Sequence, residues 1–251
     1  QLITLKNLIK FFGVLKGLNM FLLRYVNRKE YYNIIIRELE NDFSDYLISI
    51  NNKVNKLPLN RIGDSSCNIW VLWYQGLENA PQVVKDNVRR LNKLTQDTKY
   101  KVRFLNKDNI LNYLALPDYI NEKVKKGQIT LTHLSDIIRA GLLSKYGGIW
   151  LDSTCYVKKN NFDLITKYHF YTQKYKPGAS TFFNEGKWSG FFMASGQENP
   201  LEVYLYNIFL IYWKKYNVLI DYFLIDVFLE IGYRKIPKVK KIIDQVPYNN
   251  P

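Results

Sequence analysis

Short strand-like runs alternate with helical segments over the last three quarters of the chain, and this alternation limits the possible folds more than any other feature. Residues 69–73 and 100–105 are short apolar stretches rich in strand-forming residues. Between them, residues 81–94 are predicted to form a helix that begins at a proline. Further helices are expected from Lys107 and from Pro117. Strands joined by helices in this way indicate an α/β domain with a largely parallel sheet.

The first part of the chain shows a different pattern, and we predict a helical segment in front of the α/β domain. Apolar residues recur at helical spacing between Leu5 and Leu15, and a second helical stretch covers about residues 29–50. A linker that contains proline and glycine follows. The chain therefore divides into a helical segment at 1–60 and an α/β domain at 61–251.

The net charge of +14, from 36 basic and 22 acidic residues, restricts the partners of the chain. The basic residues are scattered, without zinc-finger spacing or the aromatic signature of RNA-recognition modules, so we expect no nucleic-acid partner. An anionic membrane surface or a nucleotide diphosphate accounts better for the charge. The two cysteines have no CxxC spacing and are expected to be free thiols in a reducing cytoplasm.

The most apolar part of the N-terminal segment, from Leu8 to Val26, is interrupted by Lys10, Lys16 and Arg24. A membrane-spanning helix needs about 20 predominantly apolar residues, so we predict no spanning helix there. Two interpretations stay open. The segment is either a basic amphipathic element on the inner face of the cell membrane or a helix that packs on the α/β domain.

The stretch from residue 129 to 157 carries the most specific pattern. Asp136 and Arg139 are three residues apart on a predicted helix, so they share one face of it. A Gly-Gly pair at 147–148 ends that helix, and a short apolar strand then leads directly to Asp152. The Asp-Arg pair by itself is typical of a solvated helix surface. Its place beside a carboxylate at a strand end favours a binding site, because ligands of α/β folds bind at the carboxyl ends of strands.

This pattern resembles that of the capsular polysaccharide synthesis proteins. These are glycosyltransferases of the A-type (GT-A) fold, related to the yeast initiating mannosyltransferases and the large clostridial glucosylating toxins. The resemblance covers about residues 66–250 and implies a GT-A-like nucleotide-sugar-binding fold. It also implies transfer of a sugar from a nucleotide diphosphate sugar to a saccharide or lipid-linked saccharide acceptor, in capsular or surface polysaccharide synthesis. Likeness to the toxins implies UDP as the carrier and retention of configuration. Relatives of this kind often continue further, so we expect the catalytic domain to extend beyond residue 251.

The resemblance assigns Asp152 as the main anchor for a divalent cation, Mn²⁺ or Mg²⁺, and for the diphosphate. Carboxylate oxygens are the ligands that such hard cations prefer. Thr154 stands where the parent pattern has a second aspartate, so we expect a weak or indirect metal ligand there. Arg139 is suited to a forked contact with a phosphate or sugar oxygen, and Asp136 to accepting hydrogen bonds from sugar hydroxyls.

Other donor-binding residues follow from the same resemblance. Trp73 is expected to stack on the base, with a core tryptophan as the alternative, and Gln75 and Gly148 are expected beside the donor. The Trp188-Ser189 pair matches a family element near the sugar and phosphates. A loop tryptophan is also often only a packing anchor, so this assignment stays open.

Asp226 lies in an apolar run that resembles one in the capsular family, and it is assigned as a catalytic or acceptor-side carboxylate together with Asp152. The alternative is the polar face of an amphipathic helix shared with Asp221. His133 is expected to be structural. Two other functions remain as alternatives: a glycoside hydrolase that uses Asp152 and Asp226 as a carboxylate pair, and a basic membrane- or nucleic-acid-binding module without catalysis.

Overall fold

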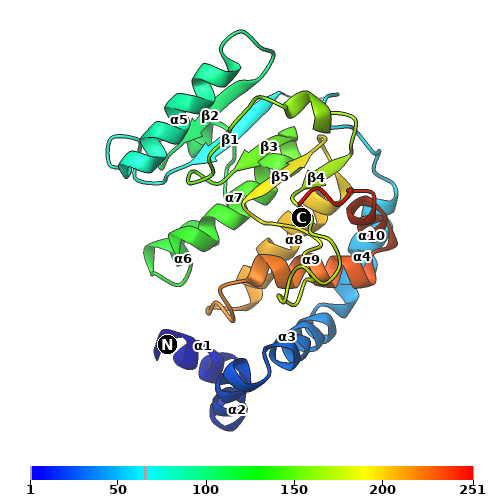
Figure 1. The fold of residues 1–251 in the computed structure, drawn as a ribbon. Coiled ribbons are helices and arrows are strands. Elements are labelled where there is room, and N and C mark those ends of the chain that lie inside the picture. The colour runs from blue at the N-terminus through cyan, green and yellow to red at the C-terminus, as the bar shows by residue number, and fades with distance from the viewer. Residues whose placement is uncertain (1, 65–66, 251) are drawn as a thin grey trace.

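The computed structural model describes residues 2–64 and 67–250, and its centre is a five-stranded sheet with the order β2-β1-β3-β5-β4 (Figure 1). The strands are β1 (Asn68–Leu72), β2 (Lys101–Leu105), β3 (Gly148–Leu151), β4 (Phe170–Thr172) and β5 (Phe192–Ser195). β1 runs parallel to both β2 and β3, whereas β5 is antiparallel to both of its neighbours. Four strands therefore point the same way and only β5 is reversed. The predicted α/β class with a mostly parallel sheet is confirmed.

Ten α-helices surround the sheet in the described part of the chain. They are α1 (Leu2–Phe12), α2 (Val14–Val26), α3 (Arg28–Asp42), α4 (Ser44–Asn55), α5 (Gln82–Thr95), α6 (Asp118–Lys125), α7 (Leu131–Tyr146), α8 (Pro200–Lys215), α9 (Leu224–Lys235) and α10 (Pro237–Asp244).

The helix predicted from Lys107 is wrong, because only a short 3₁₀ turn forms at Ile110–Asn112. The side chain of Asn106 accepts hydrogen bonds from the backbone N–H groups of Asp108 and Asn109. The side chain of Asn109 accepts one from the backbone of Asn106 in return. Such local side-chain contacts compete with helix formation and stabilise a turn instead.

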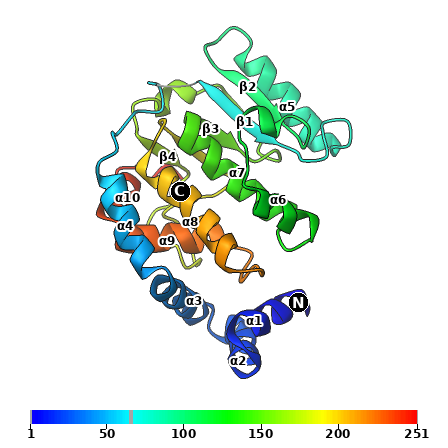
Figure 2. The ribbon, with the colours of Figure 1, turned by 180° about the vertical axis from the view of Figure 1, so that it is seen from behind.

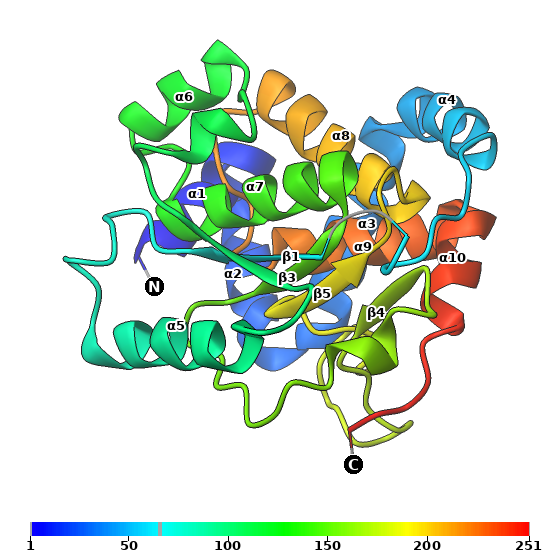
Figure 3. The same ribbon diagram turned by 90° about the horizontal axis from the view of Figure 1, so that it is seen from above.

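Helices cover both faces of the sheet (Figure 3). Successive residues of a strand point to opposite faces. Accordingly, Ile69 and Val71 of β1 pack with α5 on one face. Trp70 and Leu72 belong to the larger core on the other face, together with α7 and α8. The carboxyl ends of β1 and β3 lie between these two layers of helices. Most of the predicted site residues lie at this edge of the sheet.

The N-terminal segment consists of four helices, in two parts. α3 and α4 pack against α9 and α8, and Tyr31 and Tyr32 of α3 are completely buried there. α1 and α2 form a hairpin at the far end of the molecule from α5 (Figures 1 and 2). The hairpin turns at Gly13, whose φ of 81° favours glycine. α1 and α2 approach so closely that a Cβ on Gly17 would lie 2.6 Å from the Cα of Ile9.

None of the helices in the described residues is long and apolar enough to cross a bilayer. The exposed apolar side chains of the N-terminal hairpin lie along one helix, α2. Five of them are between 41% and 85% exposed, and they are Val14, Leu15, Leu18, Leu22 and Val26.

Candidate active site

The helix α7 and the strand β3 place the central residues of the site. The side chain of Thr130 caps α7 by accepting a hydrogen bond from the backbone of His133. Gly147 ends the helix with a φ of 63°, and a Cβ there would lie 2.6 Å from the backbone nitrogen of Gln197. Because β3 starts in the next residue and is only four residues long, Asp152 emerges directly at the carboxyl edge of the sheet.

A pocket of about 480 Å³ opens at this edge, between the ends of β1 and β3 and the first turns of α7 and α9. It brings together seven of the residues that the sequence assigned to the site. These are Trp73, Gln75, Asp136, Arg139, Asp152, Thr154 and Asp226.

Asp136, Arg139 and Asp152 form a charged cluster in the pocket wall. Nη2 of Arg139 lies 2.5 Å from Oδ1 of Asp136 and 3.8 Å from Oδ1 of Asp152. Arg139 also donates to the backbone oxygen of Gly190, and the indole N–H of Trp150 donates to Asp152 at 2.8 Å. Asp136 and Arg139 are only 7% and 4% exposed. The alternative of a solvated helix pair is therefore wrong.

His133 is a buried neighbour of Asp136 on α7. The indole N–H of Trp213 donates to Nε2 of His133 at 2.9 Å. Nδ1 of His133 lies 3.5 Å from Oδ2 of Asp136 and makes no hydrogen bond to a described residue. His133 is buried, as a structural histidine would be. The spacing of three residues between His133 and Asp136 places both side chains on one face of the helix.

Trp73, Gln75 and Thr154 form the outer wall of the pocket. β1 ends at Leu72, so Trp73 is the first residue beyond the strand. The Trp73 side chain is half-buried, packs against the core on the α5 face and also lines the pocket. Gln75 and Thr154 are exposed. Thr154 lies two residues after Asp152, in the turn that follows β3.

Asp226 enters the pocket from the first turn of α9 and is 8% exposed. Its Oδ1 accepts hydrogen bonds from the indole N–H of Trp188 at 2.8 Å and from the side-chain amide of Asn184 at 3.2 Å. Burial raises the pKa of Asp226 to about 7, and the charge of Asp136 adds to the rise. Asp221 is also buried, so the alternative of an exposed polar face shared by Asp221 and Asp226 is wrong.

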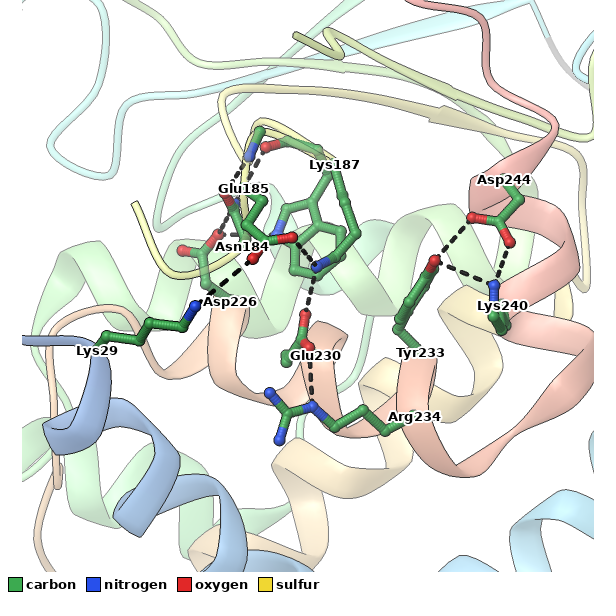
Figure 4. A network of polar contacts seen from close by, with 12 residues as sticks. Lys29, Asn184, Glu185, Lys187, Asp226, Glu230, Tyr233, Arg234, Lys240 and Asp244 are labelled. Atoms are coloured by element: carbon green, nitrogen blue, oxygen red, sulfur yellow. Dashed lines mark hydrogen bonds and ion pairs between the residues drawn. The ribbon is translucent and has the colours of Figure 1, made fainter. Parts of the chain in front are cut away.

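The loop before β5 is held on α9 by a network of polar contacts (Figure 4). Asn184 lies beside Asp226, and the ammonium group of Lys187 lies 3.2 Å from Glu230, which also pairs with Arg234 at 2.8 Å. The contact between Asn184 and Asp226 joins positions 42 residues apart, so no local sequence pattern indicates it.

Trp188 and Ser189 do not line the main pocket but an adjoining cavity of about 450 Å³. Trp188 is 2% exposed and holds Asp226, and the hydroxyl of Ser189 donates to the backbone oxygen of Gln173. Four residues line both spaces, so the two cavities meet at Gly190, Phe191, Phe223 and Asp226.

Gly148 lies outside the pocket, contrary to its assignment as a donor-binding residue. It is the first residue of β3 and pairs with Ser195, whereas the pocket opens after the last residue of the strand. Asp152 is four positions further along the chain than Gly148, at about 3.3 Å for each position of extended strand. Its φ of 102° makes it a structural glycine that joins α7 to β3.

A divalent cation would find few protein ligands here. Within residues 2–64 and 67–250, no three His, Cys, Asp or Glu side chains are grouped as a metal site. The pocket offers hard oxygen atoms from Asp152 and from the hydroxyl of Thr154. This set suits a cation that keeps water and takes most of its remaining ligands from substrate phosphates, as Mg²⁺ usually does.

The fold and the acid-lined pocket define an α/β protein with a ligand site at the carboxyl edge of its sheet. The model of one family, described as capsular polysaccharide synthesis protein, matches residues 19–251. The chain therefore belongs to the capsular polysaccharide synthesis protein family, and the resemblance found in the sequence is confirmed.

Several characterised proteins are similar over part of the chain. The O-glycosyltransferase PaGT of Phomopsis amygdali is 36% identical over 99 residues, which are 36% of this chain and 24% of PaGT. The O-glycosyltransferase braB of Annulohypoxylon truncatum is 29% identical over 112 residues, 40% of this chain and 25% of braB. The matched part therefore spans about a quarter of the length of these relatives. A solved structure, the PaToxG glycosyltransferase, aligns with a TM-score of 0.46 and 17% identity over 86% of this chain and 83% of that one.

Proposed function

We propose that this chain is the catalytic part of a glycosyltransferase that moves a sugar from a nucleotide diphosphate sugar to a saccharide acceptor. The main observation in support is the Asp136–Arg139–Asp152 cluster at the carboxyl edge of the sheet. It supplies one fixed guanidinium and two carboxylates in a pocket large enough for a small ligand. Membership of the family and the names of the matched relatives support it.

In the proposed complex, Trp73 stacks on the base, for which uracil is the first choice, and Gln75 contacts the same half of the donor. Arg139 binds a diphosphate oxygen and Asp136 a sugar hydroxyl. Asp152, with Thr154 as a weaker ligand, holds a divalent cation, Mn²⁺ or Mg²⁺. When bound, that cation supplies positive charge to the leaving diphosphate.

The acceptor is proposed to enter through the adjoining cavity, because the two spaces meet at Asp226. Only one oxygen of Asp226 is used by Trp188 and Asn184. The other oxygen is available to bind the acceptor hydroxyl and to stabilise the positive charge that develops on the sugar. Retention of configuration and a role in capsular or surface polysaccharide synthesis complete the proposal. They rest on family resemblance.

Nucleotide binding tests the proposal. UDP with Mn²⁺ should raise the melting temperature, because a ligand that binds only the folded state stabilises it. Trp73→Ala should weaken UDP binding by about 1–3 kcal/mol, the range for base–aromatic stacking. Tyr25→Ala, which removes an exposed ring on α2, serves as the control and should leave the affinity unchanged. A carboxylate-pair hydrolase or a non-catalytic basic module should show no shift with UDP, and that result would sink the proposal.

We also propose that the α1–α2 hairpin makes a peripheral contact with the inner face of the cell membrane. The outward apolar side chains of α2 support this. Lys16 of the same helix pairs with Glu38 at 2.5 Å, so its charge is partly offset. The double variant Leu15→Asp/Leu22→Asp should lose flotation with anionic vesicles. Ile48→Asp, at an equally exposed position on α4, should not. Equal flotation of both variants would contradict the contact.

A further inference from the structure

A second large cavity, of about 670 Å³, lies between the N-terminal hairpin and two loops of the α/β domain. One loop follows α6 and the other joins α8 to α9, and the latter extends toward α1 (Figures 1 and 2). The side-chain amide of Asn7 donates to the backbone oxygen of Leu219 at 2.9 Å and so holds α1 against this second loop. We refer to this cavity as the basic groove.

Four basic side chains line the basic groove: Lys6, Lys10, Arg24 and Lys126. Lys6 and Lys10 are exposed and make no ion pair with any residue that the structure describes. Lys126 lies 3.5 Å from Glu122, in a pair whose two side chains are both about 65% exposed, so that pair offsets little of its charge.

Asp221 is the single acidic residue among the described residues of the groove lining. Its carboxylate is already occupied by contacts within the protein. Its carboxylate accepts hydrogen bonds from Tyr31 at 2.8 Å, Tyr32 at 3.2 Å and the backbone of Phe223 at 2.9 Å. Arg24 lies 4.0 Å away from it. The groove therefore has an excess of positive charge, which favours the binding of an anionic ligand.

The basic groove adjoins the pocket at the sheet edge, because Thr132 and Tyr222 line both of them. A ligand bound in the groove would thus end beside the place where the donor sugar is proposed to lie. The groove is also set apart from the Asp136–Arg139–Asp152 cluster, since none of these three residues lines it.

We propose that the basic groove binds a phosphate or diphosphate group carried by the acceptor, and so selects phosphate-bearing acceptors. This rests on the proposed transferase function. Lysines supply several separate positive charges, which suits a compact anion with two or more negative charges. The same chemistry is presented by a phosphate attached to a lipid and by a phosphate on a soluble saccharide.

Binding of inorganic pyrophosphate, measured by calorimetry in EDTA, tests the groove. Lys6→Ala/Lys10→Ala should bind pyrophosphate about tenfold more weakly than the wild type, which corresponds to about 1.4 kcal/mol. Lys6→Arg/Lys10→Arg should restore most of the affinity. Lys85→Ala/Lys93→Ala on α5 removes the same net charge at the other end of the molecule and should change nothing. Pyrophosphate binding in the donor pocket should be the same in all variants. The difference in affinity between the variants therefore measures binding in the groove.

Flotation with vesicles then identifies the source of the phosphate. If the phosphate is lipid-borne, the Lys6→Ala/Lys10→Ala variant should bind phosphatidylcholine vesicles containing phosphatidic acid more weakly than the α5 control. If the phosphate belongs to a soluble saccharide, the two variants should float equally, although their affinities for pyrophosphate still differ. Pyrophosphate affinity that is equal in the Lys6→Ala/Lys10→Ala variant and the wild type, or absent in both, overturns the proposal.

Measuring UDP with Mn²⁺ on the same variants separates the two proposals. The Mn²⁺-dependent part of UDP binding should be equal in all of them, because the altered lysines lie outside the donor pocket. A wild type that binds pyrophosphate through the groove but shows no Mn²⁺-dependent UDP binding would contradict the transferase function and leave the anion site in place.

Discussion

Two groups of carboxylates line the same pocket, and their charges are balanced in different ways. Asp136 and Asp152 share the guanidinium group of Arg139. Asp226 contacts only neutral donors, the indole of Trp188 and the amide of Asn184. Lys187, which directly precedes Trp188 in the loop, pairs with Glu230 instead.

This contrast suits the two groups to different roles. Carboxylates that share a buried guanidinium have a partner of opposite charge, which suits a fixed site for a diphosphate and a cation. A buried carboxyl with neutral partners has its pKa raised, for Asp226 to about 7, so its charge changes near neutral pH. One side of the pocket thus consists of ion pairs, and the other carries a carboxyl group that responds to pH.

The largest expected effect is on stability, from Arg139→Ala. This change leaves Asp136 buried without its partner, and breaking a buried pair costs about 3–5 kcal/mol. Urea unfolding would measure the loss. Arg89→Ala, which breaks an exposed pair with Asp86, should cost less than about 0.5 kcal/mol. If both variants unfold at the same urea concentration, the charged cluster does not have the energetic role assigned to it here.

Asp152→Asn should act on turnover rather than on stability. The side chain of Asp152 is 39% exposed and an amide oxygen can still accept from Trp150, so the fold should remain intact. Loss of the charge that holds the cation and diphosphate should lower turnover by about 100-fold or more. Asp108→Asn, an exposed carboxylate outside the pocket, is the control. Activity near that of the wild type would remove Asp152 from the catalytic machinery.

Asp226→Asn should change how stability depends on pH. Because the pKa of Asp226 is about 7 in the folded protein and about 3.8 when exposed, the folded state binds more protons between these values. The free energy of unfolding should therefore fall as the pH rises from about 4 through about 7. In the variant, the free energy of unfolding should no longer show this part of its decrease with pH. Burial also raises the pKa of Glu202, to about 8, so Glu202 contributes a further decrease of the same sign in both proteins.

Melting temperatures from pH 4 to pH 8 would measure the difference between Asp226→Asn and the wild type, with Glu202→Gln as a second variant that removes the other slope. If Asp226→Asn and the wild type lose stability in parallel, Asp226 is ionised throughout and the contrast between the two carboxylate groups disappears.

The smallest expected effect is that of Thr154→Asp. Thr154 is exposed, so a carboxylate at this position is solvated and should leave stability unchanged. It should tighten Mn²⁺ binding modestly, by adding a charged oxygen ligand next to Asp152. Titration of Mn²⁺ with and without UDP would measure this. Loss of all nucleotide binding would instead place Thr154 in contact with the donor.

The features that could be predicted from the sequence are those that depend on neighbouring residues. The alternation of strands and helices predicts the sheet, and the glycine pair at 147–148 predicts the end of α7. Since β3 follows at once, Asp152 had to lie at a strand end. All of this follows from helix and strand geometry within about 25 residues.

Contacts between side chains that are distant in the sequence could be found only in the folded structure. Trp213 lies 80 residues from His133, and Trp188 lies 38 residues from Asp226. Gly148, which was assigned to the donor site by resemblance, lies at the amino end of β3, whereas the pocket opens beyond the carboxyl end. The basic groove exists because α1 and α2 fold back onto loops more than 100 residues away. Such contacts depend on how helices and strands pack together, and the spacing of residues within one element does not predict that packing.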